Sequence, residues 1–103
     1  MPVSSTHLVL IPSYNPGPKV FDTVRAALGQ WSPVWVVVDG STDGSDAQLV
    51  KLAQSNRDLT VHVLPVNKGK GAAVLTGLMR AQAMGFTHVL TMDSDGQIGR
   101  AHV

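Results

Sequence analysis

Cysteine is absent from this sequence of 103 residues. The chain can therefore form neither a disulfide nor a thiolate metal site, although the absence does not fix the cellular compartment. Charge is sparse and balanced, because eight Lys and Arg against seven Asp and Glu leave a formal net charge of +1. With no run of basic residues, the sequence offers no electrostatic basis for binding nucleic acid or an anionic membrane surface.

Long hydrophobic runs are also lacking. No apolar run approaches the roughly 20 residues that a membrane-spanning helix needs, and residues 1–6 show neither the cationic nor the apolar segment of a signal peptide. We therefore expect no membrane segment in this fragment and a cytoplasmic location, with membrane association left open for a longer parent protein. The hydrophobic fraction of 44% is ordinary for one small domain or a piece of a larger one.

Short apolar runs predict the strands, and the segments between them predict helices. The first run is continuous rather than alternating, which is typical of a strand covered on both faces of a parallel sheet. The third carries Thr60 and His62 between apolar residues, which places it nearer a sheet edge. The strands are expected at 7–11, 34–38, 59–64 and 88–92, and the helices at about 18–28, 45–54 and 71–84.

Two details of the helices are predicted from side-chain pattern. Ser45 with Gln48 forms the S-x-x-Q pattern of a capping box at the start of the second helix. Gly77, a residue that is costly in the middle of a helix, predicts that the third helix and the sheet approach closely there. The residues expected to face inward from the third helix are Val74, Leu75, Leu78, Met79 and Ala81.

The alternation of strand and helix predicts an α/β fold. Right-handed crossovers would build about four parallel strands with helices on both faces, in the expected order 3-2-1-4. The loops after strands 1, 2 and 4 then converge at the switch point between strands 1 and 4. This topology brings Tyr14, Asp39 and the pair Asp93 and Asp95 to one edge of the sheet.

The fourth strand ends in two carboxylates, Asp93 and Asp95. Successive side chains of an extended chain alternate, so both carboxylates share one side. Two hard oxygen donors suit a divalent cation of the Mg²⁺ or Mn²⁺ type, and such a cation suits a substrate that carries phosphates. For an isolated D-x-D-G, the alternative is a simple turn at the strand end before Gly96.

Three further side chains could serve a phosphorylated nucleotide. Tyr14, in a loop braced by prolines, offers a face on which a base could stack, and Asp39 offers an acceptor for a ring N–H. Lys70, at the entry to the third helix, could meet a phosphate with help from the helix N-terminus. Each also has an ordinary alternative: packing for Tyr14, turn chemistry for Asp39 and a solvated surface position for Lys70.

Four motifs in order strengthen the interpretation as a nucleotide site. The motifs read IPSYN at 11–15, VVDGSTDG at 37–44, NKGKGAA at 67–73 and MDSDGQ at 92–97. Together they resemble the N-terminal half of a family 2 glycosyltransferase with the Rossmann-like GT-A fold, and they are similar to the dolichol-phosphate mannose synthase-like branch in particular. Family members usually carry Asp-Asp before Gly-Ser, and here Val38 replaces the first of the pair.

The resemblance implies a hexosyltransferase that uses Mg²⁺ or Mn²⁺ and a UDP- or GDP-sugar. The acceptor is unknown, with a lipid-linked acceptor as one option. No catalytic base is visible, because relatives supply it from the half that would follow. The residues implied to bind the donor nucleotide are Pro12, Tyr14, Asn15, Asp39, Lys70 and Asp93, and those implied to hold the metal are Asp95 and Asp93.

The resemblance covers the chain only as far as Gln97. We expect residues 1–97 to be the nucleotide-sugar-binding half of a glycosyltransferase domain, inactive as a fragment by itself. The final hexapeptide, 98–103, is what ATC GGA AGA GCA CAC GTC encodes, which is part of a common sequencing-adapter oligonucleotide. We therefore expect 98–103 to be a non-native tail.

Two other functions fit the same residues. Asp93-Ser94-Asp95-Gly96 resembles the first motif of haloacid dehalogenase-type phosphatases, in which Asp93 would be the nucleophile and Asp95 the acid/base. That motif usually opens its domain, whereas here it closes a series of strand and helix units. The remaining alternative is a non-catalytic binding module or an inactive fragment.

Overall fold

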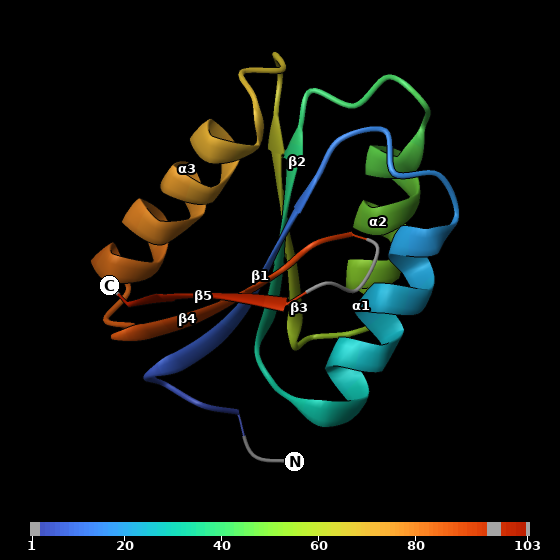
Figure 1. Ribbon diagram of the computed structural model, residues 1–103. Coiled ribbons are helices and arrows are strands. Elements are labelled where there is room, and N and C mark those ends of the chain that lie inside the picture. Colours follow the sequence, from blue (N-terminus) through green and yellow to red (C-terminus); the bar gives the residue numbers. More distant parts are fainter. Residues whose placement is uncertain (1–2, 95–97, 103) are drawn as a thin grey trace.

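The computed structural model describes residues 3–94 and 98–102, so the predicted metal ligand Asp95 lies outside the described residues. Strands and helices alternate as the sequence predicts, with a further strand after the last of them (Figure 1). In chain order the elements are β1 His7–Ser13, α1 Lys19–Gln30, β2 Val34–Asp39, α2 Ser45–Gln54, β3 Leu59–Leu64, α3 Lys70–Ala83, β4 His88–Met92 and β5 Ile98–His102.

The strands form a five-stranded sheet in the order β3-β2-β1-β4-β5. β1 pairs in parallel with β2 on one side and β4 on the other, and β2 pairs in parallel with β3, which confirms the predicted order 3-2-1-4. β5 was not predicted. It runs antiparallel to β4 with Ile98 opposite Met92, an arrangement that needs only a short connection. Strand pairing does not bear on the origin of residues 98–103, so the non-native tail stays a prediction.

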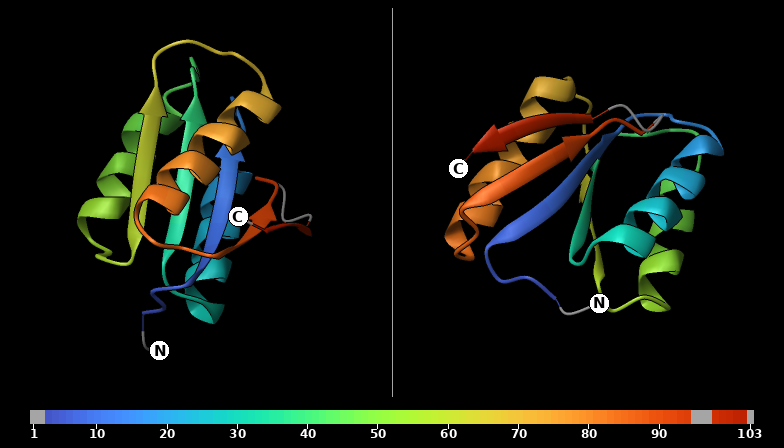
Figure 2. Two further views of the ribbon diagram at one scale, coloured as in Figure 1. Left: turned by 90° about the vertical axis from the view of Figure 1, so that its left-hand side faces the viewer. Right: turned by 60° about the horizontal axis from the view of Figure 1, so that its bottom comes forward.

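Helices cover both faces of the sheet, as predicted (Figures 1 and 2). On one face, Val9 and Ile11 of β1 pack with Val20 and Val24 of α1 and with Leu49 of α2. The intervening residues of β1 pack on the opposite face, against α3. β2 is buried along its whole length, whereas β3 is only partly buried at the sheet edge. Burial on both faces explains the continuous apolar runs of the inner strands. The second cluster contains Leu8, Leu10, Trp35, Val37, Ala73, Ala81, Phe86 and Val89.

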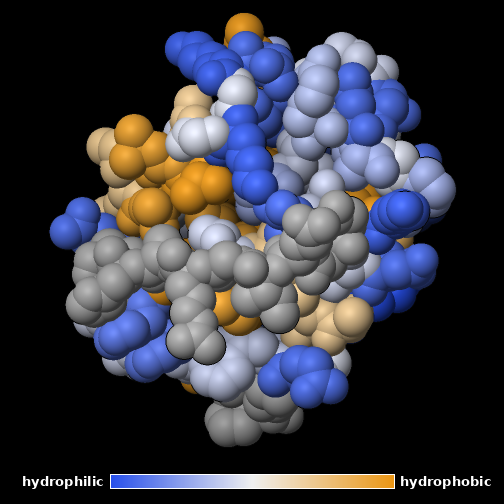
Figure 3. All heavy atoms as spheres, in the orientation of Figure 1, coloured by the Kyte–Doolittle hydropathy of each residue, from blue (hydrophilic) through white to orange (hydrophobic). Residues whose placement is uncertain are grey.

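α3 packs on the sheet through small residues. Ala73, Gly77 and Ala81 recur every four residues and are the buried positions of the helix. A Cβ atom at Gly77 would lie 2.7 and 2.8 Å from the two terminal methyl carbons of Leu10, which confirms the predicted close approach. The small stripe faces the sheet, so the prediction that Leu75 and Met79 face inward is wrong: they are 57% and 62% exposed. Hydrophobic side chains accordingly gather over α3 at the surface (Figure 3).

The predicted capping box at the start of α2 is also wrong. Gly44 is the N-cap, with a left-handed φ of 84°, and Ser45 is the first helical residue. Asp43 takes over part of the capping, because its Oδ1 accepts a hydrogen bond of 3.0 Å from the Ser45 N–H. A glycine adopts this backbone conformation at little cost, which moves the cap one residue earlier than the side-chain pattern suggests.

Among the described residues, no helix combines the length and apolar character needed to cross a membrane.

The glycines of α3 provide a matched test of the close helix–sheet contact. Gly77→Ala should lower the free energy of unfolding by about 1–2 kcal/mol, because overpacking against Leu10 outweighs the gain in helix propensity of about 1 kcal/mol. Gly71→Ala, where a Cβ meets nothing within 4 Å, should be neutral or stabilising. Urea unfolding of both variants measures the difference. Equal stability of the two variants would show that α3 does not pack closely against β1 at Gly77.

Candidate functional site

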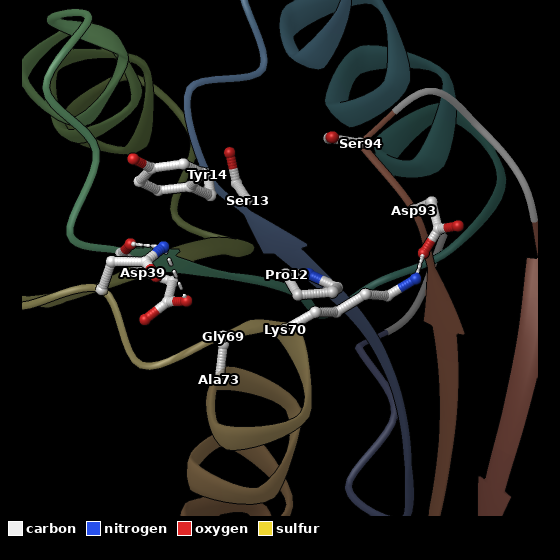
Figure 4. A pocket seen from close by; sticks show the side chains of 10 residues that line it. Pro12, Ser13, Tyr14, Asp39, Gly69, Lys70, Ala73, Asp93 and Ser94 are labelled. Atoms are coloured by element: carbon white, nitrogen blue, oxygen red, sulfur yellow. Dashed lines mark hydrogen bonds and ion pairs between the residues drawn. The ribbon is translucent and has the colours of Figure 1, made fainter.

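A pocket of about 470 Å³ lies at the carboxyl ends of β1, β2 and β4, where the loops after these strands meet the start of α3 (Figure 4). Its lining includes the predicted residues Pro12, Tyr14, Asp39, Lys70 and Asp93. The topology explains this convergence, because the carboxyl ends of parallel strands meet at one edge and the strand order reverses at β1. The lining residues that were not singled out from sequence are Ser13, Asn67, Gly69, Ala73 and Ser94.

The pocket has two chemically different ends (Figure 4). At one end, Tyr14 lies near Asp39, and the tyrosine is 51% exposed, so a face of its ring is accessible for stacking. At the other end, Lys70 and Asp93 point toward each other. An aromatic and acceptor end opposite a charged end suits an elongated ligand with a ring at one terminus and phosphates at the other.

Asp39 is buried at the end of β2, with 1% of its surface exposed. Its carboxylate joins this strand to the β3–α3 loop: Oδ1 accepts 3.0 Å from the Lys68 N–H and Oδ2 accepts 3.2 Å from Asn67 Nδ2. The two loops also touch at Gly40, where an added Cβ would lie 2.6 Å from the carbonyl carbon of Val66. Asp39 thus holds the β3–α3 loop, which forms part of the pocket wall.

Lys70 forms an ion pair with Asp93 across the charged end. Lys70 is the first residue of α3, preceded by Gly69 at a φ of 96°, so the free N–H groups of the helix start lie at the same place. On the far side, Thr23 of α1 donates a hydrogen bond of 2.8 Å to the Ser94 carbonyl oxygen and anchors the chain just after Asp93. A partly exposed ion pair contributes about 1 kcal/mol at most, so a charged ligand can displace it at little cost.

Among the described residues, Asp93 is the side chain at this end that could bind a metal ion. The described part of the chain contains no cluster of three or more His, Cys, Asp or Glu able to hold one. The carboxylate of Asp93 is an oxygen donor of the kind that Mg²⁺ and Mn²⁺ prefer. It also attracts the Lys70 ammonium, which shows that the position favours positive charge.

Asn15 does not line the pocket; it joins two loops beside it. Its Oδ1 accepts hydrogen bonds from the N–H groups of Thr42 (2.7 Å) and Asp43 (3.2 Å), and its Nδ2 donates to Thr42 Oγ1 at 3.2 Å. Its own N–H donates 2.9 Å to Ser41 Oγ. Asp43 Oδ2 in turn accepts 3.2 Å from the Gly17 N–H. The side chain that the family resemblance implies for the donor therefore holds the β1–α1 loop against the β2–α2 loop.

The position of Asn15 in its motif can be recognised from sequence, but its role cannot. Its backbone is left-handed, with a φ of 42°, which Asn tolerates better than most residues. Asn67 shows the same limit: it stands in the glycine loop, but no sequence signal indicates that its amide meets Asp39, 28 residues earlier.

Substitutions at Asn15 separate its backbone role from its side-chain role. Asn15→Gly keeps the left-handed backbone and removes the side-chain bonds, which should cost about 1–3 kcal/mol of unfolding free energy. Asn15→Ala loses the same bonds and adds strain at positive φ, which should cost about 1 kcal/mol more. Chemical denaturation of both variants measures the difference, and an alanine variant as stable as the glycine variant would contradict it.

Asp43 should make the free energy of unfolding depend on pH in the acidic range. The hydroxyl and backbone N–H of Ser45, together with the Gly17 N–H, hold the pKa of the Asp43 carboxyl below its usual value of 3.8. The unfolded chain then binds this proton at higher pH than the folded chain, so the stabilisation is present above about pH 4 and is lost as pH falls through the folded pKa. We expect Asp43→Asn to be less stable than wild type at pH 6, with the difference shrinking towards pH 2 in urea titrations. A difference that does not change with pH would contradict this assignment.

Comparison with known proteins places these features in a family. The model of Glycosyl transferase family 2 matches residues 8–103. TuaG of Bacillus subtilis, a glycosyltransferase whose name assigns it to teichuronic acid biosynthesis, is 36% identical over 90 residues, which cover 84% of this chain and 34% of TuaG. The polyprenol monophosphomannose synthase of Mycolicibacterium smegmatis is 37% identical over 94 residues, covering 86% of this chain and 35% of that protein.

A solved structure shows the same fold. The mannosyltransferase PcManGT from Pyrobaculum calidifontis, in complex with GDP-Man and Mn²⁺, superposes with a TM-score of 0.74 at 24% identity, covering 90% of this chain and 30% of that one. At this identity the likeness shows the fold alone. The chain spans about a third of the length of the two curated relatives described above. Because the family model matches nearly the whole sequence, this chain belongs to glycosyltransferase family 2.

Proposed function

We propose that this chain is the donor-binding part of a glycosyltransferase that takes a sugar from a nucleoside diphosphate and transfers it to an acceptor. The observation that carries the proposal is one pocket with an aromatic end and a charged end, in which the end of β2 meets residues of the loops after β1, β3 and β4. Family membership supports the reaction class. The reaction of the whole protein is part of the proposal, because the chain spans only part of its relatives.

At the aromatic end, Tyr14 and Asp39 support binding of the nucleotide base. The tyrosine ring offers a stacking face, and its backbone neighbour Asn15 holds the loop that carries it. Pro12 lies in the lining between this end and Lys70. A stacked base gains affinity when the platform is already fixed, because little conformational entropy remains to be lost on binding.

At the charged end, Asp93, Lys70 and the start of α3 support binding of the diphosphate with a divalent cation. Asp93 would hold Mg²⁺ or Mn²⁺ together with Asp95, which lies outside the described residues. A bound cation would neutralise the negative charge of the diphosphate as it leaves the sugar. Lys70 then exchanges its carboxylate partner for a phosphate oxygen, a change between two similar charge-assisted bonds.

UDP- and GDP-sugars are the candidate donors. The solved relative bound to GDP-Man and Mn²⁺ supports GDP and Mn²⁺ as the first pair to test. Similarity to a polyprenol monophosphomannose synthase supports a lipid-linked acceptor and membrane association of a longer parent protein. No general base is assigned, so the chain alone is expected to bind the donor without transferring its sugar.

Calorimetry of the chain with GDP and UDP, each with and without Mn²⁺, tests the proposal. One nucleotide should bind only when Mn²⁺ is present, and Asp95→Ala or Asp93→Ala should weaken this binding at least about tenfold by removing a cation ligand. Asp22→Ala is the matched control, since Asp22 is an exposed carboxylate on α1 that does not line the pocket. It should leave the affinity unchanged.

Other outcomes would support the alternatives. A folded wild-type chain that binds neither nucleotide with Mn²⁺ would leave a non-catalytic fragment as the better description. A covalent phosphoaspartate at Asp93 would favour the phosphatase chemistry, which the family match argues against.

A further inference from the structure

β3 lies at one edge of the sheet and pairs with β2 along its inner side (Figure 2). In the described part of the chain, no strand pairs with its outer side. Sheets usually protect such an edge with charged side chains, a proline within the strand or a bulge. The sequence of β3, LTVHVL at 59–64, contains no Asp, Glu, Lys, Arg or Pro, and its register with β2 is unbroken. The outer side of β3 is therefore open to pairing with another strand.

The pairing with β2 decides which backbone groups of β3 point outward. The carbonyl oxygens of Asp58 and Leu64 accept hydrogen bonds of 2.9 and 3.0 Å from N–H groups at or just past the two ends of β2. In a parallel ladder, every second residue of a strand bonds to the same neighbour, so the even-numbered residues of β3 bond to β2. The N–H and C=O groups of Val61 and Val63 consequently point away from β2, toward the open edge.

Val61 and Val63 also offer apolar side chains at this edge. Both side chains lie on the same face of the sheet, because the residues are two apart along the strand. Val63 is 46% exposed, and Val61 packs against the core cluster that contains Leu59. An added strand would thus find both backbone partners and a β-branched pair to pack against.

His62 lies between the two valines and carries little charge that would oppose pairing. Burial and the nearby Arg80 guanidinium hold the pKa of His62 below its usual value of 6.5, so its ring is mostly neutral at pH 7. Arg80 reaches from α3 and donates to His62 Nδ1 at 2.9 Å. Because Arg80 is exposed, water screens its charge from the same charge of another molecule.

We propose that β3 pairs antiparallel with β3 of a second copy of this chain, with Val61 of each copy opposite Val63 of the other. Residues that face each other in this way exchange both N–H···O=C bonds. A twofold axis then passes beside His62, and the outward N–H and C=O groups of both valines have partners in both copies. The four valines form one apolar cluster across the axis.

The edge favours this register and a second copy as the partner. Moving the axis by one residue toward Leu59 or Pro65 would leave a valine carbonyl without a donor. The reason is that the Leu59 N–H already donates 3.0 Å to the Asn56 carbonyl and proline has no N–H. A twofold contact brings each charge close to the same charge of the other copy, and residues 59–66 contain no Asp, Glu, Lys or Arg. Residues 59–64 do not line the pocket, so pairing at β3 is independent of the proposed function.

Sedimentation equilibrium of the chain at pH 7 tests the proposal. One pair of short strands buries less than the roughly 1,200–2,000 Å² of a standard interface, so we expect a reversible dimer with a Kd on the order of 100 µM. Val63→Lys should weaken the dimer at least about tenfold, because it places an ammonium group of each copy in the valine cluster.

Met79→Lys is the matched control, since Met79 is 62% exposed on α3 and not on the edge strand. It should leave the dimer Kd within about twofold of wild type. A wild-type chain that stays monomeric at about 1 mM would overturn the proposal. So would a dimer that Met79→Lys weakens and Val63→Lys does not, because the contact would then lie on α3.

Amide exchange with water tests the register in wild type, where no substitution can disturb the fold. The N–H groups of Val61 and Val63 should exchange about fivefold more slowly at ten times the Kd than in dilute solution, because about four fifths of the chain is then dimeric. The N–H groups of Thr60 and His62 bond to β2 in the monomer as well, so they should exchange slowly at both concentrations. A dimer in which the Val61 and Val63 amides exchange as fast as in the monomer would contradict the proposed pairing.

Discussion

The pairing of β1 with β2 on one side and β4 on the other is the constraint on which the rest of the structure depends. Because all three strands run parallel, their carboxyl ends lie at one edge of the sheet. The chain must cross back over the sheet after each strand, which places α1 and α2 on one face and α3 on the other. Tyr14, Asp39 and Asp93 meet because each follows one of these strands, not because they are near one another in sequence.

Polar side chains then give the converging loops a definite shape. Asn15 and Asp43 join the loop after β1 to the loop after β2. Asp39 joins the loop after β2 to the loop before α3 through Asn67 and Lys68. Each loop is held by its neighbour, so the end of the pocket at Tyr14 and Asp39 is formed by the fold itself. A preorganised site of this kind spends little binding energy on ordering its own walls.

At the charged end of the pocket, the ion pair between Lys70 and Asp93 can be exchanged for contacts with a charged ligand. Lys70 and Asp93 satisfy one another across an accessible pair, at the start of a helix whose free N–H groups also favour anions. In the proposed function, a metal ion and a diphosphate would together carry the charges that both side chains require, so one ion pair would be replaced by two favourable contacts. This pairing of a rigid end with a charged end supports the proposal that the pocket binds a nucleoside diphosphate, whose base requires shape and whose phosphates require charge.

Sequence alone determined the four parallel strands, their order and half of the residues that line the pocket. It could do so because continuous apolar runs are buried on both faces of a sheet and the loop motifs follow those runs. It could not determine the partners of the polar side chains. Asn67 meets Asp39 only after β2 and β3 have paired, and β5 carries no hydrophobic run to reveal it. Nor could it determine the buried face of α3. The larger side chains of Leu75 and Met79 suggested that their face is buried, but both are exposed. Close packing on Leu10 instead buries the face that carries the small residues Ala73, Gly77 and Ala81. Tertiary structure decided these points because hydrogen-bond partners and packing distances depend on segments that are remote in the chain.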